Sequence, residues 1–317
     1  MEKFIKEFEV GEDIQGFYIV KSFNVKVSSN DKKYIDLTLG DVTGEINGKI
    51  WDVKNLEEYE IKTGDVVKIR AKVTLWQNSN QLKINKIRKG EEGDAYDFKN
   101  LVEAAPHDPD FMFRFIMGYI EKIRSEDIRL VVKFIVNEYK EKLMVYPAAM
   151  KNHHAIRSGL MYHIMRMLKL GESMAEIYPN VNKDLLFAGI ILHDIEKINE
   201  MNSDDMGIVS EYSRDGQLLG HIIQGIKKID KVCRELGVDE EVSILLEHMI
   251  LSHHYEAEYG SPKKPMFPEA ELLHYIDIVD ARMYDMEKVY GSMEQEEFSD
   301  PVWVLDRRKL YKSKFHK

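Results

Sequence analysis

Histidines gather in the second half of the sequence, where nine of the eleven lie between residues 153 and 274. Some stand beside a carboxylate or beside each other, above all in the pairs His193-Asp194 and His253-His254. Imidazole nitrogens combined with carboxylate oxygens suit Mn²⁺, Fe²⁺, Co²⁺ or Zn²⁺, whereas a site for Mg²⁺ alone would be nearly all oxygen. These residue types therefore predict a transition-metal centre.

The candidate ligands exceed what one ion with open positions can use, but they suit two ions bridged by a carboxylate. Such a pair of ions handles in-line displacement at phosphorus. Asp194 is the predicted bridge. The candidates are five histidines and two aspartates: His163, His193, Asp194, His221, His253, His254 and Asp277.

A second His-Asp pair, His107-Asp108, lies in a different setting. Pro106 and Pro109 bracket it, and no helical periodicity surrounds it. We therefore expect a loop or a helix cap at this position rather than a metal ligand.

The elements that must position the ligands are helices. From Phe111 onward the apolar residues follow helical spacing nearly to the end of the chain, which predicts an all-α domain. Each candidate ligand lies in or at the end of a separate helical segment, as expected when helices point side chains into one central site. We expect helix breaks at these positions: Pro147, Gly171, 179–182, 202–208, Gly237 and 260–268.

The first 90 residues have a different periodicity. Apolar and polar residues alternate at period two in about five segments separated by Gly, Asn and Asp turns. Such a segment fits a small closed β-barrel, of which the OB-fold is the commonest nucleic-acid binder. The stretch YIDLTLGDVTGEINGKIWD, residues 34–52, resembles the central strands of OB-folds that bind single-stranded nucleic acid.

The two parts of the chain differ in charge. Residues 1–90 contain sixteen Lys and Arg against fourteen Asp and Glu, a net charge of +2. Because the whole chain has a net charge of −10, the remaining residues carry −12. A basic strip in the barrel predicts contact with a polyanion, although lysines also guard exposed sheet edges. Trp76, like Trp51, Phe23 and Tyr34, could stack on bases. The basic strip consists of Lys68, Arg70, Lys72, Lys83, Lys86, Arg88 and Lys89, and the first five of these are the candidates for contact with nucleic acid.

Neither export nor membrane insertion is indicated. The first residues carry charges of both signs, and the longest apolar runs are too short to span a bilayer. The lone Cys233 can neither form an internal disulfide nor anchor a thiolate metal site, so we expect a cytoplasmic protein.

The order H…HD…H…HH…D resembles the HD superfamily of metal-dependent phosphohydrolases in its binuclear form. With an OB-fold in front, the chain is similar to the YhaM family of 3′→5′ exoribonucleases. Ser158 stands where that family usually has the first of two glycines, and Glu196 replaces the usual glycine of H-D-I-G-K. The resemblance rests on four segments: NHHAIRSGLMYHI, EYSRDGQLLGHIIQG, LSHHYEAEYGSPKKPMFPEAELLHYIDIVDARM and VWVLDRRKLYK.

The resemblance implies an enzyme that removes nucleotides from the 3′ end of single-stranded RNA, with single-stranded DNA as a further substrate to test. It implies two divalent ions, often manganese, with Co²⁺, Fe²⁺ and Zn²⁺ as alternatives. The family pattern favours Asp277 over Asp280 as the last ligand. Lys197, with Asp194, is a candidate catalytic residue, because it would add positive charge beside the phosphate. Arg157 is a candidate for contact with the nucleic acid.

We therefore predict an OB-fold over residues 1–90, a linker over 91–110, a helical HD domain over 111–298 and a basic tail over 299–317. One alternative is an HD phosphohydrolase that acts on a small nucleotide and uses the barrel for regulation. Another is a non-catalytic RNA-binding protein, which is disfavoured because every metal position is filled.

Overall fold

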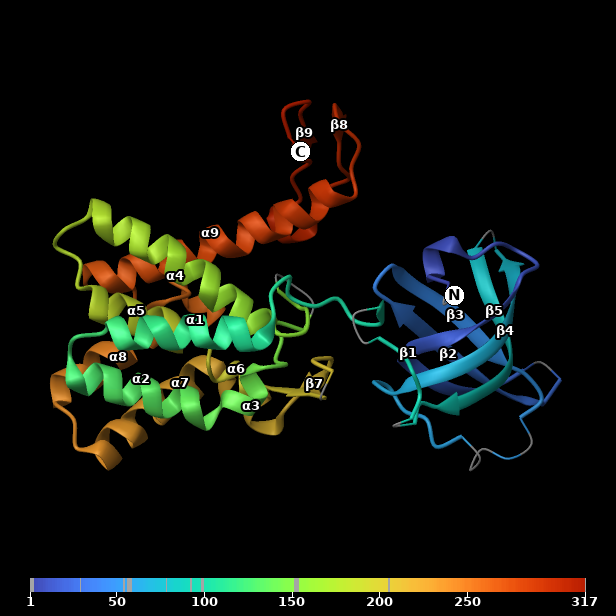
Figure 1. Cartoon of the computed structure of the whole chain (residues 1–317), viewed down its shortest axis with the longest axis horizontal. Coiled ribbons are helices and arrows are strands. Elements are labelled where there is room, and N and C mark those ends of the chain that lie inside the picture. The colour runs from blue at the N-terminus through green and yellow to red at the C-terminus, as the bar shows by residue number, and fades with distance from the viewer. Residues whose placement is uncertain are drawn as a thin grey trace. The chain divides into compact units, whose positions relative to one another are not determined.

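The computed structural model divides the chain into two compact units, residues 1–104 and 105–317 (Figure 1). Among the described residues, none of the helices is long and apolar enough to cross a membrane. The residues that the structure describes are 3–28, 30–53, 55, 59–77, 79–91, 93–97, 100–150, 154–204 and 206–316.

The first unit is a closed five-stranded barrel, as the period-two pattern predicted. Its strand order is β1-β2-β3-β5-β4, in which only the β3–β5 pair is parallel. Alternate residues fill the interior, where Leu37, Leu39 and Ile69 are at most 1% exposed. The strands are β1 (Asp13–Val27), β2 (Lys33–Asp41), β3 (Gly44–Ile50), β4 (Val66–Trp76) and β5 (Ser79–Lys89), preceded by the short 3-10 helix η1 (Ile5–Glu7).

An aspartate closes the turn between β2 and β3. The Asp41 carboxylate accepts hydrogen bonds from the backbone N–H of Thr43 at 2.7 Å and from its hydroxyl at 2.6 Å. A side chain that bonds to backbone two residues later replaces part of a regular turn. Gly44 then adopts a φ of +154° as β3 begins.

The second unit is helical, with two small hairpins in addition. The helices are α1 (Pro109–Lys122), α2 (Glu126–Glu138), α3 (Lys140–Leu143), α4 (Gly159–Ile177), α5 (Lys183–Leu192), α6 (Lys197–Glu200), α7 (Arg214–Leu236), α8 (Glu240–Ser252) and α9 (Pro268–Gly291). One hairpin pairs β6 (Met201–Ser203) with β7 (Val209–Tyr212), and the other pairs β8 (Glu297–Phe298) with β9 (Tyr311–Lys312). Short 3-10 helices, η3 (Ala257–Tyr259) and η4 (Trp303–Leu305), complete the unit.

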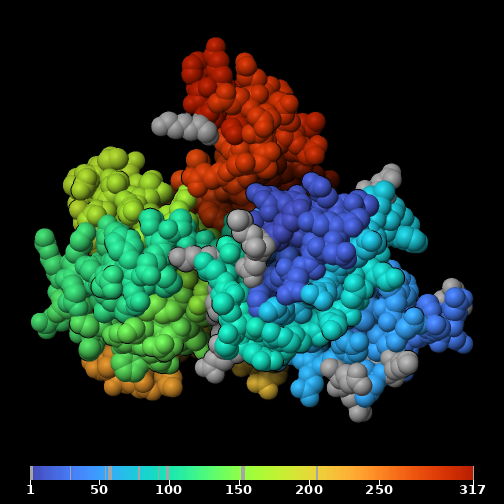
Figure 2. All heavy atoms as spheres, turned by 45° about the vertical axis from the view of Figure 1, so that its right-hand side comes forward, coloured from blue at the N-terminus to red at the C-terminus, as the bar shows by residue number. Residues whose placement is uncertain are grey.

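Two expectations about local structure have clear outcomes. Asp108 is the N-cap of α1, where its side chain accepts the Phe111 N–H, so the predicted cap is confirmed. The predicted basic tail, residues 299–317, includes η4 and β9, and β9 pairs with β8 in a hairpin that protrudes from the helices of its unit (Figure 2).

The helix break expected at Gly171 is wrong, because Gly171 lies inside α4. A Cβ added there would lie 2.6 Å from Cδ1 of Ile190 in α5. The glycine therefore permits close packing of α4 against α5, and both helices carry candidate ligands. Sequence spacing cannot distinguish a glycine that ends a helix from one that lets two helices approach.

We expect Gly171→Val to lower the free energy of unfolding by about 1–3 kcal/mol, because it overpacks the α4–α5 contact. Gly118→Val is the matched control, since it makes the same change inside α1 at a site with no atom within 4 Å of an added Cβ. Urea unfolding followed by circular dichroism measures both. An equal effect of the two substitutions would show that Gly171 has no packing role.

Candidate metal centre

The candidate ligands come from five helices or from residues that directly follow them. His163 lies in α4, His221 in α7 and Asp277 in α9. His193 caps the C-terminus of α5 and Asp194 follows it, just as His253 caps α8 and His254 follows. His163, His193, Asp194 and His253 are at most 2% exposed.

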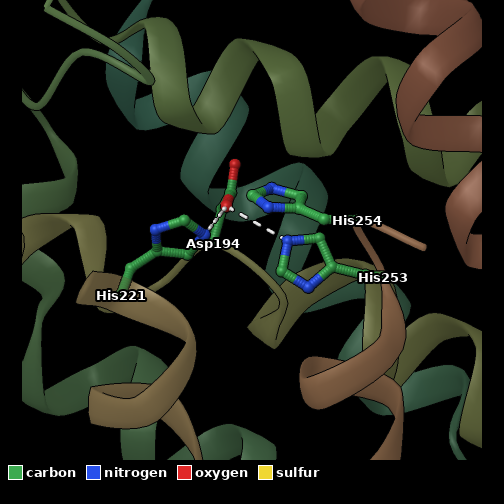
Figure 3. Close-up of side chains that lie close together, drawn as sticks. All are labelled: Asp194, His221, His253 and His254. Atoms are coloured by element: carbon green, nitrogen blue, oxygen red, sulfur yellow. Dashed lines mark ion pairs between the residues drawn. The ribbon is translucent and has the colours of Figure 1, made fainter. Parts of the chain in front are cut away.

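One group of ligands surrounds an oxygen of Asp194. Its Oδ1 lies 3.3 Å from Nε2 of His221 and 3.8 Å from Nε2 of His253. Figure 3 shows Asp194 between His221 on one side and His253 with His254 on the other. One donor atom from each of the four residues lies within 4.8 Å of the others, which is close enough to hold a metal ion.

A second group consists of His163, His193 and Asp277, again with donor atoms within 4.8 Å of one another. Nε2 of His163 lies 3.2 Å from Oδ1 of Asp277. Nε2 of His193 lies 3.3 Å from Oδ2 of Asp194. Asp194 thus presents one carboxylate oxygen to each group. The structure brings all seven candidate ligands together.

Hydrogen bonds on the far side of the rings orient the histidines. A carbonyl oxygen can only accept, so each ring that faces one carries its proton on Nδ1 and directs the Nε2 lone pair inward. Three rings have such a backbone partner: His193 with Ile190 at 2.8 Å, His253 with Ile250 at 2.7 Å and His254 with Tyr259 at 2.6 Å.

Several inward atoms lack a hydrogen-bond partner among the described residues. They are Nε2 of His193, His221 and His253, and Oδ1 of Asp194. A buried polar atom without a partner is rare and costs about 1–3 kcal/mol. The donor set consists of imidazole and carboxylate, which are the groups that bind divalent transition metals. The residues therefore fit a metal centre.

The pKa shifts of these ligands also support a metal centre. Burial opposes ionisation of Asp194, but Lys197 and the neighbouring histidines hold its pKa well below the usual range. Burial lowers the pKa of His253. Burial also opposes the charge on His163, but its bonds to Asp277 and Asp280 raise its pKa to about 9. An ion that binds at Nε2 of His163 must therefore displace a proton.

Lys197 lies at the edge of the centre. Its ammonium donates to Oδ2 of Asp194 at 2.6 Å. Burial by itself lowers the pKa of Lys197, but Asp194, together with Asp277 and Glu200, raises it above its usual value. The neighbouring Glu196 has a φ of −79° and needs no glycine. Its buried carboxylate accepts bonds from the Tyr139 hydroxyl at 2.6 Å and from Asn199 at 2.7 Å. Glu196 therefore holds α6 to the segment that follows α2.

Ser158 shows why glycine is usual at its position. It has a φ of 59°, in the left-handed region that glycine adopts without strain. The serine hydroxyl donates to the carbonyl of Met144 at 2.6 Å, and its N–H donates to that of Val145 at 3.0 Å. These bonds hold the start of α4, about one turn before His163.

Arg157 and His248 belong to neither ligand group. Arg157 precedes α4, and its carbonyl accepts the Ala105 N–H at 2.9 Å. The ring of His248 lies beside that of Phe267, with centroids 5.3 Å apart and the planes tilted by 43°. Sequence reasoning missed Glu200, which contacts His221. No spacing rule links it to His221, because the β6–β7 hairpin lies between them.

The basic strip of the barrel lies on two adjacent strands. Arg70 pairs across the β4–β5 ladder with Lys86, and Lys72 pairs with Lys83. All four side chains are exposed. Like charges placed opposite each other in a ladder repel. A bound polyanion would reduce this repulsion between the paired cations. Lys68 differs, because it lies 3.9 Å from Asp94 and over the ring of Phe17.

Aromatic rings lie close to this strip. Tyr34 and Trp51 stack with centroids 4.8 Å apart, and Trp51 is 45% exposed. Trp76, at the end of β4, is 58% exposed. The ammonium of Lys49 lies between 5.3 and 5.9 Å from the centroids of all three rings. Lys49 also pairs with Lys83 across the β3–β5 ladder, which connects the rings to the basic strip.

Comparisons with known families match both units. Residues 160–282 match the HD domain family, and residues 19–89 match the family described as OB-fold nucleic acid binding domain. The chain carries an OB-fold followed by an HD domain. The HD domain indicates a metal-dependent phosphohydrolase.

Solved structures with local similarity include the second OB-fold domain of replication protein A from Methanococcus maripaludis, at 20% identity over 31% of this chain and 100% of that one, with a TM-score of 0.24. A mitochondrial single-stranded DNA binding protein of S. cerevisiae, Rim1, matches at 15% identity over 26% of this chain and 99% of that one, with a TM-score of 0.23. A chain of a replication protein A heterotrimer bound to single-stranded DNA matches at 18% identity over 29% and 63%, with a TM-score of 0.21.

We expect Asp194→Asn to lose tight metal binding, because Asp194 faces both ligand groups. Titration with Mn²⁺ should show about two ions per wild-type chain, and Mn²⁺ at a hundredfold its Kd should add about 2.7 kcal/mol of stability for each ion bound. Asp108→Asn is the control: it makes the same change in the other His-Asp pair, where asparagine also caps a helix. Two tight ions in Asp194→Asn would contradict the assignment.

Proposed function

We propose that this protein is a metal-dependent 3′→5′ exoribonuclease that hydrolyses single-stranded RNA to nucleoside 5′-monophosphates. The observation that carries the proposal is the shared Asp194 carboxylate, with one oxygen toward each of two ligand groups, 3.3 Å from His193 and 3.3 Å from His221. Two ions held this way suit displacement at phosphorus. We propose manganese as the ion, in keeping with the resemblance to the YhaM family.

The candidate ligands form one set for each ion, and Lys197 supports the shared carboxylate. His163, His193 and Asp277 would hold one ion, and His221, His253 and His254 the other, with Asp194 between them. When bound, the ions supply Lewis-acid polarisation of the phosphoryl oxygens. Lys197 holds Asp194 in place through its 2.6 Å bond, and its positive charge would stabilise the negative charge that develops on the phosphate.

The barrel supplies a surface for capture. The HD domain belongs to the acidic part of the chain and would repel a polyanion, whereas the barrel offers Arg70, Lys72, Lys83 and Lys86 without an ion-pair partner among its described residues. Phosphates bind such a strip in a salt-dependent manner, and exposed aromatic rings stack on bases of any sequence. Trp51 and Trp76 are the proposed stacking residues.

The direction of digestion and the preference for RNA rest on the resemblance to the YhaM family. The nature of the product rests on the chemistry. Hydrolysis that uses water as the nucleophile leaves the ribose 2′-OH unused, so no 2′,3′-cyclic phosphate forms. We propose that the P–O3′ bond breaks and the 3′-oxygen leaves as a hydroxyl on the shortened strand, so that the released nucleotide carries a 5′-phosphate. A small-nucleotide phosphohydrolase with the same centre would show no advantage for a longer strand.

We expect a 5′-labelled single-stranded RNA to shorten progressively from its 3′ end when Mn²⁺ is present, and a stable duplex to stall the enzyme. Denaturing gels measure the lengths, and chromatography identifies the nucleotides released. A DNA strand of the same sequence tests the choice of sugar. Release of the labelled nucleotide first, or cyclic phosphate ends, would contradict the proposal, and turnover of mononucleotides alone would favour the small-nucleotide enzyme.

We expect Trp76→Ala combined with Trp51→Ala to raise KM for a long single strand by about 5-fold to 150-fold per ring lost, since stacking is worth about 1–3 kcal/mol per base. Hydrolysis of a dinucleotide should change little. Trp303→Ala removes a 71% exposed tryptophan of the helical unit and serves as the control. An equal loss on long and short substrates would show that the two rings support the fold rather than capture.

A further inference from the structure

Two carboxylates stand behind the metal centre, one for each ligand group: Asp280 is buried and Glu200 is partly buried. Oδ2 of Asp280 lies 2.8 Å from Nδ1 of His163. Both oxygens of Glu200 lie 3.1 Å from Nδ1 of His221, and Oε1 also accepts the His221 backbone N–H at 3.1 Å. The other three histidines of the centre face backbone carbonyls, so these two alone among the candidate ligands described have a charged acceptor behind the ring.

The Asp280 carboxylate is itself fixed. It is 5% exposed and lies in α9, three residues after Asp277. Nε of Arg166 donates to its Oδ1 at 2.5 Å, and Nε2 of His154 lies 2.8 Å from its Oδ2. The same guanidinium continues to Glu287 at 2.9 Å. Asp280 therefore has one position, and His163 is aligned by it.

Glu200 is fixed by the backbone around it. Its carbonyl accepts the Ser213 N–H at 2.9 Å. A Cβ added to Gly216 would lie 2.0 Å from the Glu200 carbonyl oxygen, so α6 and α7 are in close contact there. Gly220 interrupts α7 with a φ of 67°, and the backbone N–H of His221 turns to Glu200 at this kink.

By distance alone, His154, His163 and Asp280 could form a further metal site. Two observations argue against it. Both oxygens of Asp280 already accept bonds, one of them from the guanidinium of Arg166, whose positive charge would repel a cation. His163 directs its other nitrogen, Nε2, to Asp277. Asp280 is thus placed to orient a ligand rather than to be one.

We propose that Asp280 and Glu200 are positioning residues, each of which holds one metal-ligating histidine of a different ion. The proposal rests on the two-ion centre of the proposed function. A carboxylate behind an imidazole fixes its tautomer and ring orientation and makes Nε2 a more basic ligand. Each carboxylate would also place a negative charge behind a ligand of one ion.

The test measures metal affinity in the full-length protein. We expect Asp280→Asn to weaken one of two bound Mn²⁺ ions by about 10-fold to 100-fold and to leave the other within about threefold. Glu200→Gln should do the same to the other ion, so the double variant should retain no tight ion. Calorimetric titration measures affinity and stoichiometry. Co²⁺ absorption spectra of the singly loaded variants should differ, because different ligands remain.

Controls match the chemistry of each change. Asp285→Asn alters a half-buried aspartate of α9, and Glu211→Gln alters an exposed glutamate of β7. Both should bind two ions as the wild type does. Asp280→Glu and Glu200→Asp keep the charge, and should weaken the same ion less, so they provide a second pair if an amide variant fails to fold. Circular dichroism reports the fold of each variant.

The outcomes separate this inference from the proposed function. A wild-type chain that binds no ions overturns the two-ion centre itself. If the wild type binds two ions and each folded variant binds both as tightly, the two-ion centre stands and the positioning role is overturned. A double variant that keeps one tight ion would show that both carboxylates serve the same position, which also overturns the assignment.

Discussion

The buried carboxylate of Asp194 is the constraint on which the helical unit depends. Removing a charged carboxylate from water is unfavourable unless opposite charge or hydrogen bonds compensate it. The structure provides Lys197 for one oxygen, while the other faces Nε2 atoms of histidines. A group in this position is stable only while its neighbours stay in place. The helices that carry those neighbours therefore have to meet at Asp194.

Two of these helices end at the site in the same way, with a histidine at the C-terminal cap. His193 caps α5 and His253 caps α8, and in both the ring Nδ1 bonds to the carbonyl three residues earlier. The last carbonyls of a helix lack backbone partners, so a capping histidine satisfies one of them and directs its other nitrogen outward from the helix end. The C-terminal end of a helix also carries partial negative charge, which favours a cation. Two helix ends thus supply ligands and a favourable field together.

Much of this arrangement could be predicted from the sequence because its signals are local. Alternation at period two predicted the barrel, and the clustered histidines predicted a set of side chains that the structure does bring together. The roles of Glu200 and Asp280 could not be predicted in this way. Glu200 reaches His221 only because Gly220 interrupts α7, and Asp280 differs from Asp277 only in which side of His163 it faces. Both facts depend on the packing of helices distant in sequence.

The same distinction applies to glycine and to charge. Gly171 and Gly220 are both helical glycines, yet one permits close packing within a continuous α4 and the other kinks α7. Likewise, Lys68 and Lys72 belong to one basic strip, but Lys68 lies near Asp94 whereas Lys72 opposes Lys83. A count of charges treats these lysines as equal. An opposed pair such as Lys72 and Lys83 experiences a repulsion that a bound polyanion would reduce. The proposed function therefore depends on two kinds of group that lack partners among the described residues: Nε2 atoms of histidines without a hydrogen bond in the helical unit, and opposed cations without an ion pair on the barrel.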